Sequence, residues 1–324
     1  MSLSLFESEK LFGQMLDGQM SESEICDILI TLADRGETAE EIAGAAKAMR
    51  ARMIAINAPA NAIDVCGTGG DGSHSLNIST AVAIVVAACG IPVAKHGNRA
   101  ASSKAGAADT LEALGLNLDR AMETAQDTLG DLGICFLFAQ KHHPALGPIA
   151  PIRRALGRRS IFNYLGPLCN PGGATRQLIG VPAPAIIPAY ADAIRLLGCE
   201  RALVVSGEEG LDEISVSGPT HTQSIGFAFE NNVIAPESAQ LSRHAPLALK
   251  GGDANYNAAA LRRLLIGEPV TDQDRAYRDA VLLNAAAALI VAGEASNLRD
   301  GAEEAAETID KGLAKALLEC WIKY

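Results

Sequence analysis

The glycine-rich segment 66–81, CGTGGDGSHSLNISTA, is the part of the sequence whose residue types and spacing point most directly to chemistry. Gly67, Gly69 and Gly72 match the G-x-G-x-x-G pattern of dinucleotide-binding loops, which by itself is weak evidence. Glycines allow a backbone to turn successive N–H groups toward one point, where they can bind an anion. The segment 77–80, NIST, then opens an apolar helix, and a helix N-terminus also attracts negative charge. The loop therefore predicts an anion site.

The end of the next predicted strand indicates which anion this is. A dinucleotide site requires an acidic residue about 20 positions after the loop, where it binds the ribose hydroxyls. Here the strand 91–94 is followed by KHGNR, which contains Lys95, His96 and Arg99. Basic side chains bind phosphate. The glycine-rich segment 66–81 is not a P-loop, because it lacks the Gly-Lys-Ser/Thr of that motif. Two adjacent polar loops therefore predict a ligand with more than one phosphate group, and not a nicotinamide cofactor.

Two further groups of charged residues could complete such a site. Asp212 and Glu213, in EEGLDE, follow another short apolar run. Magnesium is usually held by one or two carboxylates plus substrate phosphates, although a carboxylate pair in a loop is more often solvated surface. The segment 152–159, IRRALGRR, holds four arginines in seven residues. An arginine can bind a carboxylate through two parallel hydrogen bonds, and the alternative is a solvated basic helix face.

Charge and composition exclude several classes of protein. The net charge of −11 gives no overall positive field for nucleic acid or an anionic membrane. The seven cysteines are odd in number and show no C-x-x-C spacing, which is typical of reduced thiols in the cytosol. The longest apolar runs, 81–89 and 285–292, are too short to span a bilayer. We therefore expect a soluble cytoplasmic protein that binds neither nucleic acid nor membrane.

Alternating strands and helices must position these residues. After Pro59, short β-like runs are mostly separated by segments long enough for a helix, which predicts an α/β fold with a mostly parallel central sheet flanked by helices. The segment 221–229 is either a hairpin or an antiparallel addition, and 272–293 and 302–321 predict helices. The predicted strands are 62–66, 91–94, 134–138, 177–181 and 202–206.

Residues 1–61 predict helices only. Capping-box patterns at 21–24 and 38–41 precede apolar residues at helical spacing. We expect a small all-helical domain over 1–61, with part of about 144–171 packing back onto it. The α/β domain then consists of residues 62–143 and 172–324.

Six motifs, in chain order, resemble those of a known family: GTGGDG, NIST, KHGNRAASS, FAQKHHPAL, IRRALGRRSIFNYLGPLCNP and GLDE. The chain is similar to anthranilate phosphoribosyltransferases over essentially its whole length, and KHGNRAASS with GPLCNP is far more specific than the glycine loop. That family transfers the phosphoribosyl group of phosphoribosyl pyrophosphate to the amino group of anthranilate in tryptophan biosynthesis. The resemblance implies these two small-molecule substrates, a pair of Mg²⁺ ions per monomer, and a homodimer formed through the helical domain.

The resemblance also assigns residues to each substrate and to the metal. For anthranilate it implies Gly67, His96, Asn98, His143, Arg153, Gly166 and Pro167. For phosphoribosyl pyrophosphate it implies Gly67, Gly70, Asp71, Ser75, Asn77, Ile78, Ser79, Thr80, Lys95, His96, Gly97, Asn98, Arg99, Ser102, Ser103 and Ala107. The metal would be held by Ser79, Asp212 and Glu213, and the residues expected to be catalytic are Lys95, Asp212 and Glu213. His96 and His143 either line the acceptor channel or hydrogen-bond a loop.

Two positions depart from the family pattern. Ala107 stands where the family commonly has serine, and Ser75 replaces a frequent threonine. Neither change removes a charge, so we expect reduced affinity and not lost activity. No nucleophile is paired with a base in a motif, which favours direct displacement at the anomeric carbon through an oxocarbenium-like transition state.

Two alternative functions stay open at this point. A pyrimidine nucleoside phosphorylase has a related glycine loop, but it lacks the combination of KHGNRAASS and GPLCNP. A nucleic-acid-binding paralogue without transferase activity would need a basic groove, which the net charge of −11 disfavours.

Overall fold

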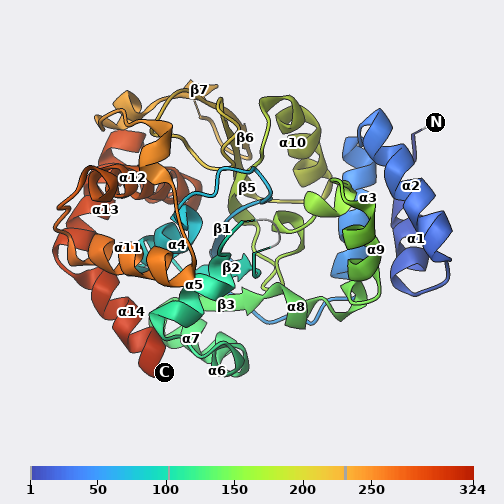
Figure 1. The fold of residues 1–324 in the computed structure, drawn as a ribbon, viewed down its shortest axis with the longest axis horizontal. Coiled ribbons are helices and arrows are strands. Elements are labelled where there is room, and N and C mark those ends of the chain that lie inside the picture. The colour runs from blue at the N-terminus through green and yellow to red at the C-terminus, as the bar shows by residue number, and fades with distance from the viewer. Residues whose placement is uncertain (1, 101–102, 230–231) are drawn as a thin grey trace.

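A seven-stranded sheet forms the centre of the computed structural model, which describes residues 2–100, 103–229 and 232–324 (Figure 1). The spatial order is β3-β2-β1-β4-β5-β6-β7, with β1 to β5 parallel and β6 and β7 antiparallel to their neighbours. The predicted α/β class is confirmed, and the segment at 221 forms the antiparallel addition. The strands are β1 (Ile63–Gly67), β2 (Val93–Gly97), β3 (Ile134–Phe138), β4 (Arg176–Gly180), β5 (Arg201–Gly207), β6 (Thr220–Ile225) and β7 (Val233–Ile234).

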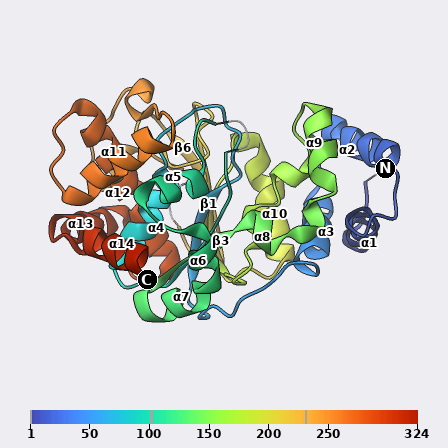
Figure 2. The same cartoon turned by 60° about the horizontal axis from the view of Figure 1, so that its bottom comes forward.

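Helices cover both faces of the sheet, with α11 to α14 on one side and α1, α2, α3 and α9 on the other (Figures 1 and 2). The first half of the chain contributes α1 (Leu5–Leu16), α2 (Glu22–Arg35), α3 (Ala39–Arg50), α4 (Ile78–Ala88), α5 (Ala107–Leu114), α6 (Leu118–Glu123), α7 (Ala125–Leu132), α8 (Ala139–His142) and α9 (Ile149–Leu156). The second half contributes α10 (Ile187–Leu196), α11 (Ala254–Ile266), α12 (Asp272–Ala292), α13 (Leu298–Asp310) and α14 (Leu313–Lys323). Short 3-10 turns lie at Pro144–Leu146, Ile161–Asn163, Pro167–Cys169, Pro184–Ile186, Pro236–Ala239 and Pro246–Leu249.

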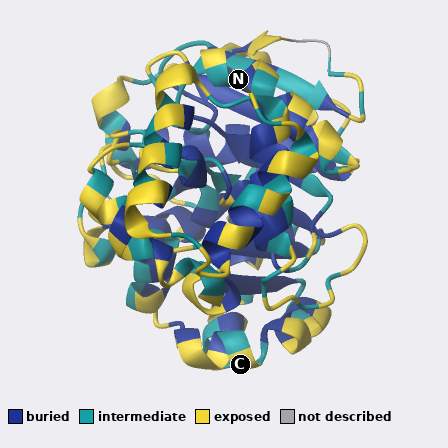
Figure 3. Cartoon of the chain, turned by 90° about the vertical axis from the view of Figure 1, so that its right-hand side faces the viewer, coloured by how far each residue is buried: buried dark blue, intermediate teal, exposed yellow. Residues whose placement is uncertain are grey.

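The two faces of the sheet belong to two different apolar cores. Leu178 and Leu203 pack with α4 and α12, whereas their chain neighbours Ile179 and Val204 pack with α10 and the N-terminal helices. Successive side chains of a strand point to opposite faces, so β4 and β5 contribute to both cores. In Figure 3 the buried segments gather in the middle of the cartoon, and exposed segments lie mostly at its periphery. The central strands, and therefore the loops that follow them, are held from both sides.

The N-terminal helices begin where the sequence predicts. Ser21 and Thr38 each cap a helix through a complete capping box, with Glu24 and Glu41 as the reciprocal partners. Residues of the 144–171 segment share an apolar core with these helices, and α9 contacts α2. The same core also includes sheet residues, and the division of the chain into two domains stays a prediction.

The C-terminal helices differ from the prediction in one respect. The expected helix over 302–321 is interrupted, because Gly312 adopts a φ of 74° and begins the separate helix α14. Helix α12 ends at Ala292 as predicted, before Gly293 with a φ of 92°, and its apolar run is buried between α4 and α13. Within the described residues, none of the helices has the length and apolar character needed to cross a membrane.

Candidate active site

The candidate site lies at the carboxyl ends of the parallel neighbours β1 and β4. The strand order of the sheet reverses there, because β2 and β3 follow on one side of β1 and β4 lies on the other. Ligands of α/β folds bind at such a switch point. Gly67 and Gly180 are register partners there, and the loop carrying Asp212 crosses over both. A Cβ on Gly67 would lie 2.2 Å from the Asp212 Oδ2, and one on Gly180 would lie 1.6 Å from the Asp212 carbonyl oxygen. Two glycines are therefore needed for this crossing, and sequence reasoning missed Gly180.

A cavity of about 170 Å³ opens beside this crossing. Its lining comes from the glycine loop, the start of α4, the segment before α5 and the Asp212–Glu213 pair. The sequence-predicted residues that the structure brings together here are Gly67, Gly70, Asp71, Ser75, Asn77, Ile78, Ser79, Ser103, Asp212 and Glu213. The glycine loop, which presents mainly backbone atoms, thus borders the cavity on one side, and the carboxylates of Asp212 and Glu213 border it on the other.

Asn77 precedes α4, but its side chain does not cap that helix. The Asn77 Oδ1 accepts hydrogen bonds from Thr110 Oγ1 at 2.6 Å and from Asn257 Nδ2 at 2.8 Å. The Tyr277 hydroxyl donates to the Asn77 carbonyl at 3.0 Å. Asn77 therefore ties the glycine loop to α5, α11 and α12. The Asn77 side chain does not cap α4, and the positive end of this helix borders the cavity, where it suits an anion.

The two carboxylates are held by backbone N–H groups of the anion loop and of α4. The Gly69 N–H donates to Asp212 Oδ2 at 2.6 Å, and the Ser79 N–H donates to Glu213 Oε1 at 3.2 Å. Burial, followed by the nearby charge of Asp71, raises the pKa of Asp212 to about 7. Burial, followed by the charge of Asp212, raises the pKa of Glu213 to about 8. The site thus gathers negative charge that it does not neutralise itself.

This arrangement fits a divalent cation shared with a phosphorylated substrate. The Asp71 Oδ2 is buried and has no hydrogen-bond partner among the residues that the structure describes. Among the same residues, no group of three or more His, Cys, Asp or Glu side chains forms a complete metal cage. Magnesium characteristically uses one or two protein carboxylates and takes its other ligands from water and substrate phosphates. The residues present therefore suit Mg²⁺ better than a metal with a full set of protein ligands.

Lys95 and Thr80 lie behind the cavity and not on its wall. Lys95 is only 2% exposed, and its Nζ donates to the Val65 carbonyl at 2.9 Å and to Ser79 Oγ at 3.4 Å. Its positive charge also acts against the increase in the pKa of Glu213. The Thr80 hydroxyl is buried without a hydrogen-bond partner in the described part of the chain. Lys95 is thus placed to act on the site through Ser79 and Glu213.

His96 and His143 form a buried pair next to the GPLCNP segment. The His96 Nδ1 lies 3.0 Å from the Gly166 carbonyl oxygen, and its Nε2 lies 3.3 Å from the Nε2 of His143. Burial, followed by the neighbouring histidine charges, lowers the pKa of His96 to about 3 and that of His143 to about 4. Both rings are neutral near pH 7. The Pro167 carbonyl accepts a hydrogen bond from Gln177 Nε2 at 2.7 Å, which fixes the adjoining turn.

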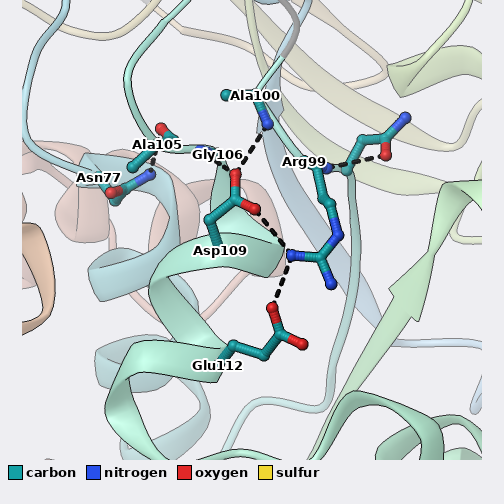
Figure 4. A network of polar contacts seen from close by, with 8 residues as sticks. Asn77, Arg99, Ala100, Ala105, Gly106, Asp109 and Glu112 are labelled. Carbon is teal, nitrogen blue, oxygen red and sulfur yellow. Dashed lines mark hydrogen bonds and ion pairs between the residues drawn. The ribbon is translucent and has the colours of Figure 1, made fainter. Parts of the chain in front are cut away.

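Arg99 is engaged by two carboxylates of α5 (Figure 4). Its Nη1 donates to Asp109 Oδ1 at 2.8 Å and to Glu112 Oε2 at 2.6 Å, and its guanidinium lies 5.7 Å from the Phe138 ring centroid. Two carboxylates therefore already neutralise its charge. The Asn98 Oδ1 accepts the Arg99 N–H at 2.8 Å.

Asp109 organises the same loop, although the sequence analysis gave it no role. Its Oδ2 accepts the N–H groups of Ala100 and Gly106, each at 2.9 Å (Figure 4). An acidic residue at the third position of a helix such as α5 is a capping signal that could have identified it. Gly97 lies close to Ala107, because an added Cβ would be 3.1 Å from that methyl group. Ser102 lies outside the described residues.

The four arginines of 152–159 have different surroundings. The Arg153 guanidinium lies 5.4 Å from the Phe162 ring centroid, and burial lowers its pKa. It has no hydrogen bond or ion pair with any residue that the structure describes. Arg158 is exposed and pairs with Asp34 at 2.5 Å, but it lies after the end of α9 and not on the predicted helix face.

Arg159, which the sequence analysis also left without a role, reaches the glycine loop. Its guanidinium donates to the carbonyl oxygens of Gly69 at 3.3 Å and Gly70 at 3.4 Å, and it lies 5.6 Å from the Tyr164 ring centroid. Its positive charge also counteracts the increase in the pKa of Asp212. Arg159 therefore connects the segment that packs on the N-terminal helices to the anion loop.

Comparison with known proteins places this site in a family. The α/β domain of the glycosyl transferase family matches residues 59–315, and the helical bundle domain of that family matches residues 2–53. The anthranilate phosphoribosyltransferase of Novosphingobium aromaticivorans is 62% identical, over 98% of this chain and 94% of its own length. The chain belongs to the anthranilate phosphoribosyltransferase family. The predicted family is thereby confirmed.

Solved anthranilate phosphoribosyltransferases share the fold. The crystal structure of the Thermus thermophilus enzyme superposes with a TM-score of 0.93 at 40% identity and covers 100% of this chain and 96% of that one. The Saccharomyces cerevisiae enzyme in complex with PRPP and Mg has a TM-score of 0.88 at 28% identity, covering 98% and 92%. The yeast enzyme has also been solved with 4-fluoroanthranilate. Membership of this family does not favour either alternative, the pyrimidine nucleoside phosphorylase or the nucleic-acid-binding paralogue.

Proposed function

We propose that this enzyme transfers the phosphoribosyl group of phosphoribosyl pyrophosphate to the amino group of anthranilate in tryptophan biosynthesis. The products are N-(5-phosphoribosyl)anthranilate and pyrophosphate. The observation that carries the proposal is the cavity between the glycine loop, the start of α4 and the Asp212–Glu213 pair, which combines anion-binding N–H groups with metal-binding carboxylates. The yeast relative solved with PRPP and Mg supports the same substrate and ion.

The donor side uses the backbone more than charged side chains. N–H groups of the glycine loop and the start of α4 bind phosphate groups, and the Ser79 hydroxyl joins Asp212 and Glu213 in holding Mg²⁺, with two ions per monomer. Magnesium neutralises the pyrophosphate and so makes it a better leaving group. Lys95 keeps Ser79 and Glu213 in place from behind.

The acceptor side contains Arg153, whose guanidinium packs on the Phe162 ring and has no acidic partner among the described residues. Arg153 binds the anthranilate carboxylate, and Asn98 and the neutral His96–His143 pair orient the aromatic amine near Gly166. The amine attacks the anomeric carbon directly while the bond to pyrophosphate breaks. Catalysis then rests on the alignment of the two substrates and on stabilisation of the leaving group.

A fluorescence assay tests this function. The purified protein is mixed with anthranilate, phosphoribosyl pyrophosphate and Mg²⁺, and consumption of anthranilate is followed by loss of its fluorescence. We expect loss that requires all three components and stops when EDTA is added. Persistent anthranilate fluorescence with a well-folded protein, or phosphate-dependent cleavage of thymidine or uridine, would contradict the proposal.

We also propose a cytoplasmic homodimer that associates through the helical region. The support is an exposed apolar residue on α1, since Phe6 is 74% exposed. In a two-fold dimer the same patch of each copy meets its counterpart, so α1 of one copy would place Phe6 against α1 of the other.

A further inference from the structure

Asn284 is a polar side chain inside an otherwise apolar part of α12. It occurs in the stretch LLNAAAALIVA and is 0% exposed. A buried carboxamide destabilises a fold unless its donors and acceptor are hydrogen-bonded. Its presence at this position therefore requires an explanation in terms of its partners.

Those partners are mainly the backbone of one residue. The Ile214 N–H donates to Asn284 Oδ1, and Asn284 Nδ2 donates to the Ile214 carbonyl oxygen, each at 2.9 Å. The second Nδ2 hydrogen bond goes to the Ala280 carbonyl, also at 2.9 Å. The side chain thus binds both the N–H and the carbonyl group of Ile214. Ile214 lies in the loop between β5 and β6, outside the strands of the sheet.

Ile214 directly follows Asp212 and Glu213. Their charges repel one another, and the loop that carries them also crosses the ends of β1 and β4. Helix α12 packs against α4, and α4 provides the Ser79 N–H that binds Glu213. An anchor from α12 to Ile214 therefore fixes the carboxylates relative to the helix that forms the other wall of the site.

We propose that Asn284 is a positioning residue, which holds the Asp212–Glu213 loop in the geometry that binds a divalent cation together with pyrophosphate. The inference rests on the proposed metal role of this pair. Groups that orient metal ligands typically account for about 10- to 100-fold in metal affinity. Asn284 does not line the cavity and reaches the carboxylate loop only through Ile214, so its loss should alter metal binding and not recognition of anthranilate.

The test is Mn²⁺ binding measured by electron paramagnetic resonance in the presence of phosphoribosyl pyrophosphate, with the full-length protein. Asn284→Ala extends the alanine run of α12, so it keeps the helix while removing both bonds to Ile214. We expect its Mn²⁺ dissociation constant to rise about 10- to 100-fold. The anthranilate KM should stay within about twofold of the parent value, because the acceptor side is not attached to Ile214.

Leu283→Ala is the matched control, because Leu283 is the buried neighbour of Asn284 on the same helix. If Leu283→Ala lowers the melting temperature as much as Asn284→Ala and weakens Mn²⁺ binding equally, the proposal is overturned. An unchanged Mn²⁺ constant in Asn284→Ala would also overturn it. If Asn284→Ala does not fold, Asn284→Ser takes its place. If neither variant folds while Leu283→Ala does, Asn284 has a role in folding alone, and the proposal is overturned.

Asp212→Asn separates this inference from the proposed function. Parent-like Mn²⁺ binding by Asp212→Asn would show that the Asp212–Glu213 pair does not hold the metal, which contradicts the proposed function. Weakened binding by Asp212→Asn together with parent-like binding by Asn284→Ala would remove only the positioning role.

Discussion

At the scale of single residues, the site is dominated by carboxylates whose charge Lys95 and Arg159 offset only in part. Asp212 and Glu213 are buried, and each has a raised pKa, first because of burial and then because of a neighbouring carboxylate. In contrast, the charge of Arg99 is neutralised by Asp109 and Glu112. The charge of the Asp212–Glu213 pair, unlike that of Arg99, is thus offset only in part, which fits the metal role that we propose for the pair.

The raised pKa values predict how pH affects stability. A carboxyl whose pKa is higher in the folded than in the unfolded state lowers the free energy of unfolding as the pH increases between these two pKa values. The unfolded pKa is near 4, and the folded pKa is about 7 for Asp212 and about 8 for Glu213. Without metal, the melting temperature should fall between about pH 6.5 and pH 8, because below about pH 6.5 the lowered pKa values of the buried His96 and His143 act in the opposite direction. Addition of MgCl₂ should raise it more at about pH 8.5 than at about pH 6, as followed by circular dichroism. Equal magnesium effects at both pH values in the parent protein would contradict the prediction.

Arg153 predicts a separation of the two substrates. In Arg153→Ala the anthranilate KM should rise about 10- to 100-fold, because a hydrogen-bonded charge pair with the substrate carboxylate is lost. The KM for phosphoribosyl pyrophosphate should change little. Arg154→Ala is the control, since Arg154 is the exposed neighbour on the same helix. Steady-state kinetics with each substrate varied in turn measures the effect, and a change confined to phosphoribosyl pyrophosphate would show the assignment to be wrong.

At the scale of secondary-structure elements, loops that follow separate strands must cross at one point. The loop after β5 passes over the ends of β1 and β4 because Gly67 and Gly180 have no side chain there. The glycine loop is in turn held by α11, which binds Asn77, and by Arg159 from the segment after α9. The geometry of the site therefore depends on contacts between elements more than on any one loop.

Gly180→Ala should disrupt this crossing. The added Cβ would overlap the Asp212 carbonyl oxygen, which lies 1.6 Å from its position, so the carboxylate loop must move. A displacement of about 1 Å typically costs about 100-fold in rate, and we expect kcat/KM to fall by that order. Gly130→Ala is the control, since a Cβ on that helical residue meets nothing within 4 Å. Retention of parent-like kcat/KM by Gly180→Ala would show that the crossing is not required.

Arg159 and Arg158 test the connection between α9 and the glycine loop. Arg159→Ala should raise the KM for phosphoribosyl pyrophosphate about 5- to 10-fold, because two hydrogen bonds to the loop are lost. Arg158→Ala removes only an exposed ion pair with Asp34, which is worth about 0–1 kcal/mol, and should leave this KM unchanged. Equal effects of the two substitutions in initial-rate assays would argue against a specific role for Arg159.

Local patterns predicted much of this arrangement, and contacts distant in sequence were missed. The strands, the capping boxes and the glycine loop are encoded in short runs, so the sheet and the Asp212–Glu213 loop could be placed from sequence. Gly180 and Arg159 could not, because their roles depend on segments far away in the chain. The sequence also indicated Lys95 for this site, but only the structure shows that its ammonium group lies behind Ser79, and its catalytic role stays a prediction.

At the scale of the whole molecule, the central sheet separates two bodies of helices. Helices α11 to α14 lie on one side, where α11 and α12 hold Asn77 at the cavity, and α1 to α3 with α9 lie on the opposite side (Figures 1 and 2). Arg159 joins the second body to the anion loop. The surface of α1 is therefore available for association while the cavity is formed elsewhere.

Phe6→Glu tests the proposed association. A charge at this exposed position should weaken a dimer formed through α1, and light scattering after size-exclusion chromatography should then give the mass of one chain, 33.7 kDa. Val270→Glu is the control, since Val270 is equally exposed on a loop distant from α1. An unchanged dimer in Phe6→Glu, or a monomeric parent protein, would contradict the proposed interface.

The crossing of the Asp212 loop over Gly67 and Gly180, and its anchor on α12, also matter while the chain is being made. The first wall of the pocket leaves the ribosome early, but the carboxylates follow more than a hundred residues later, and Asn284 later still. Chains emerge N-terminus first at about 5–20 residues per second. A nascent polypeptide therefore has no assembled catalytic centre until synthesis is nearly complete, and truncated products, which lack the last helices, would be unable to consume the activated sugar.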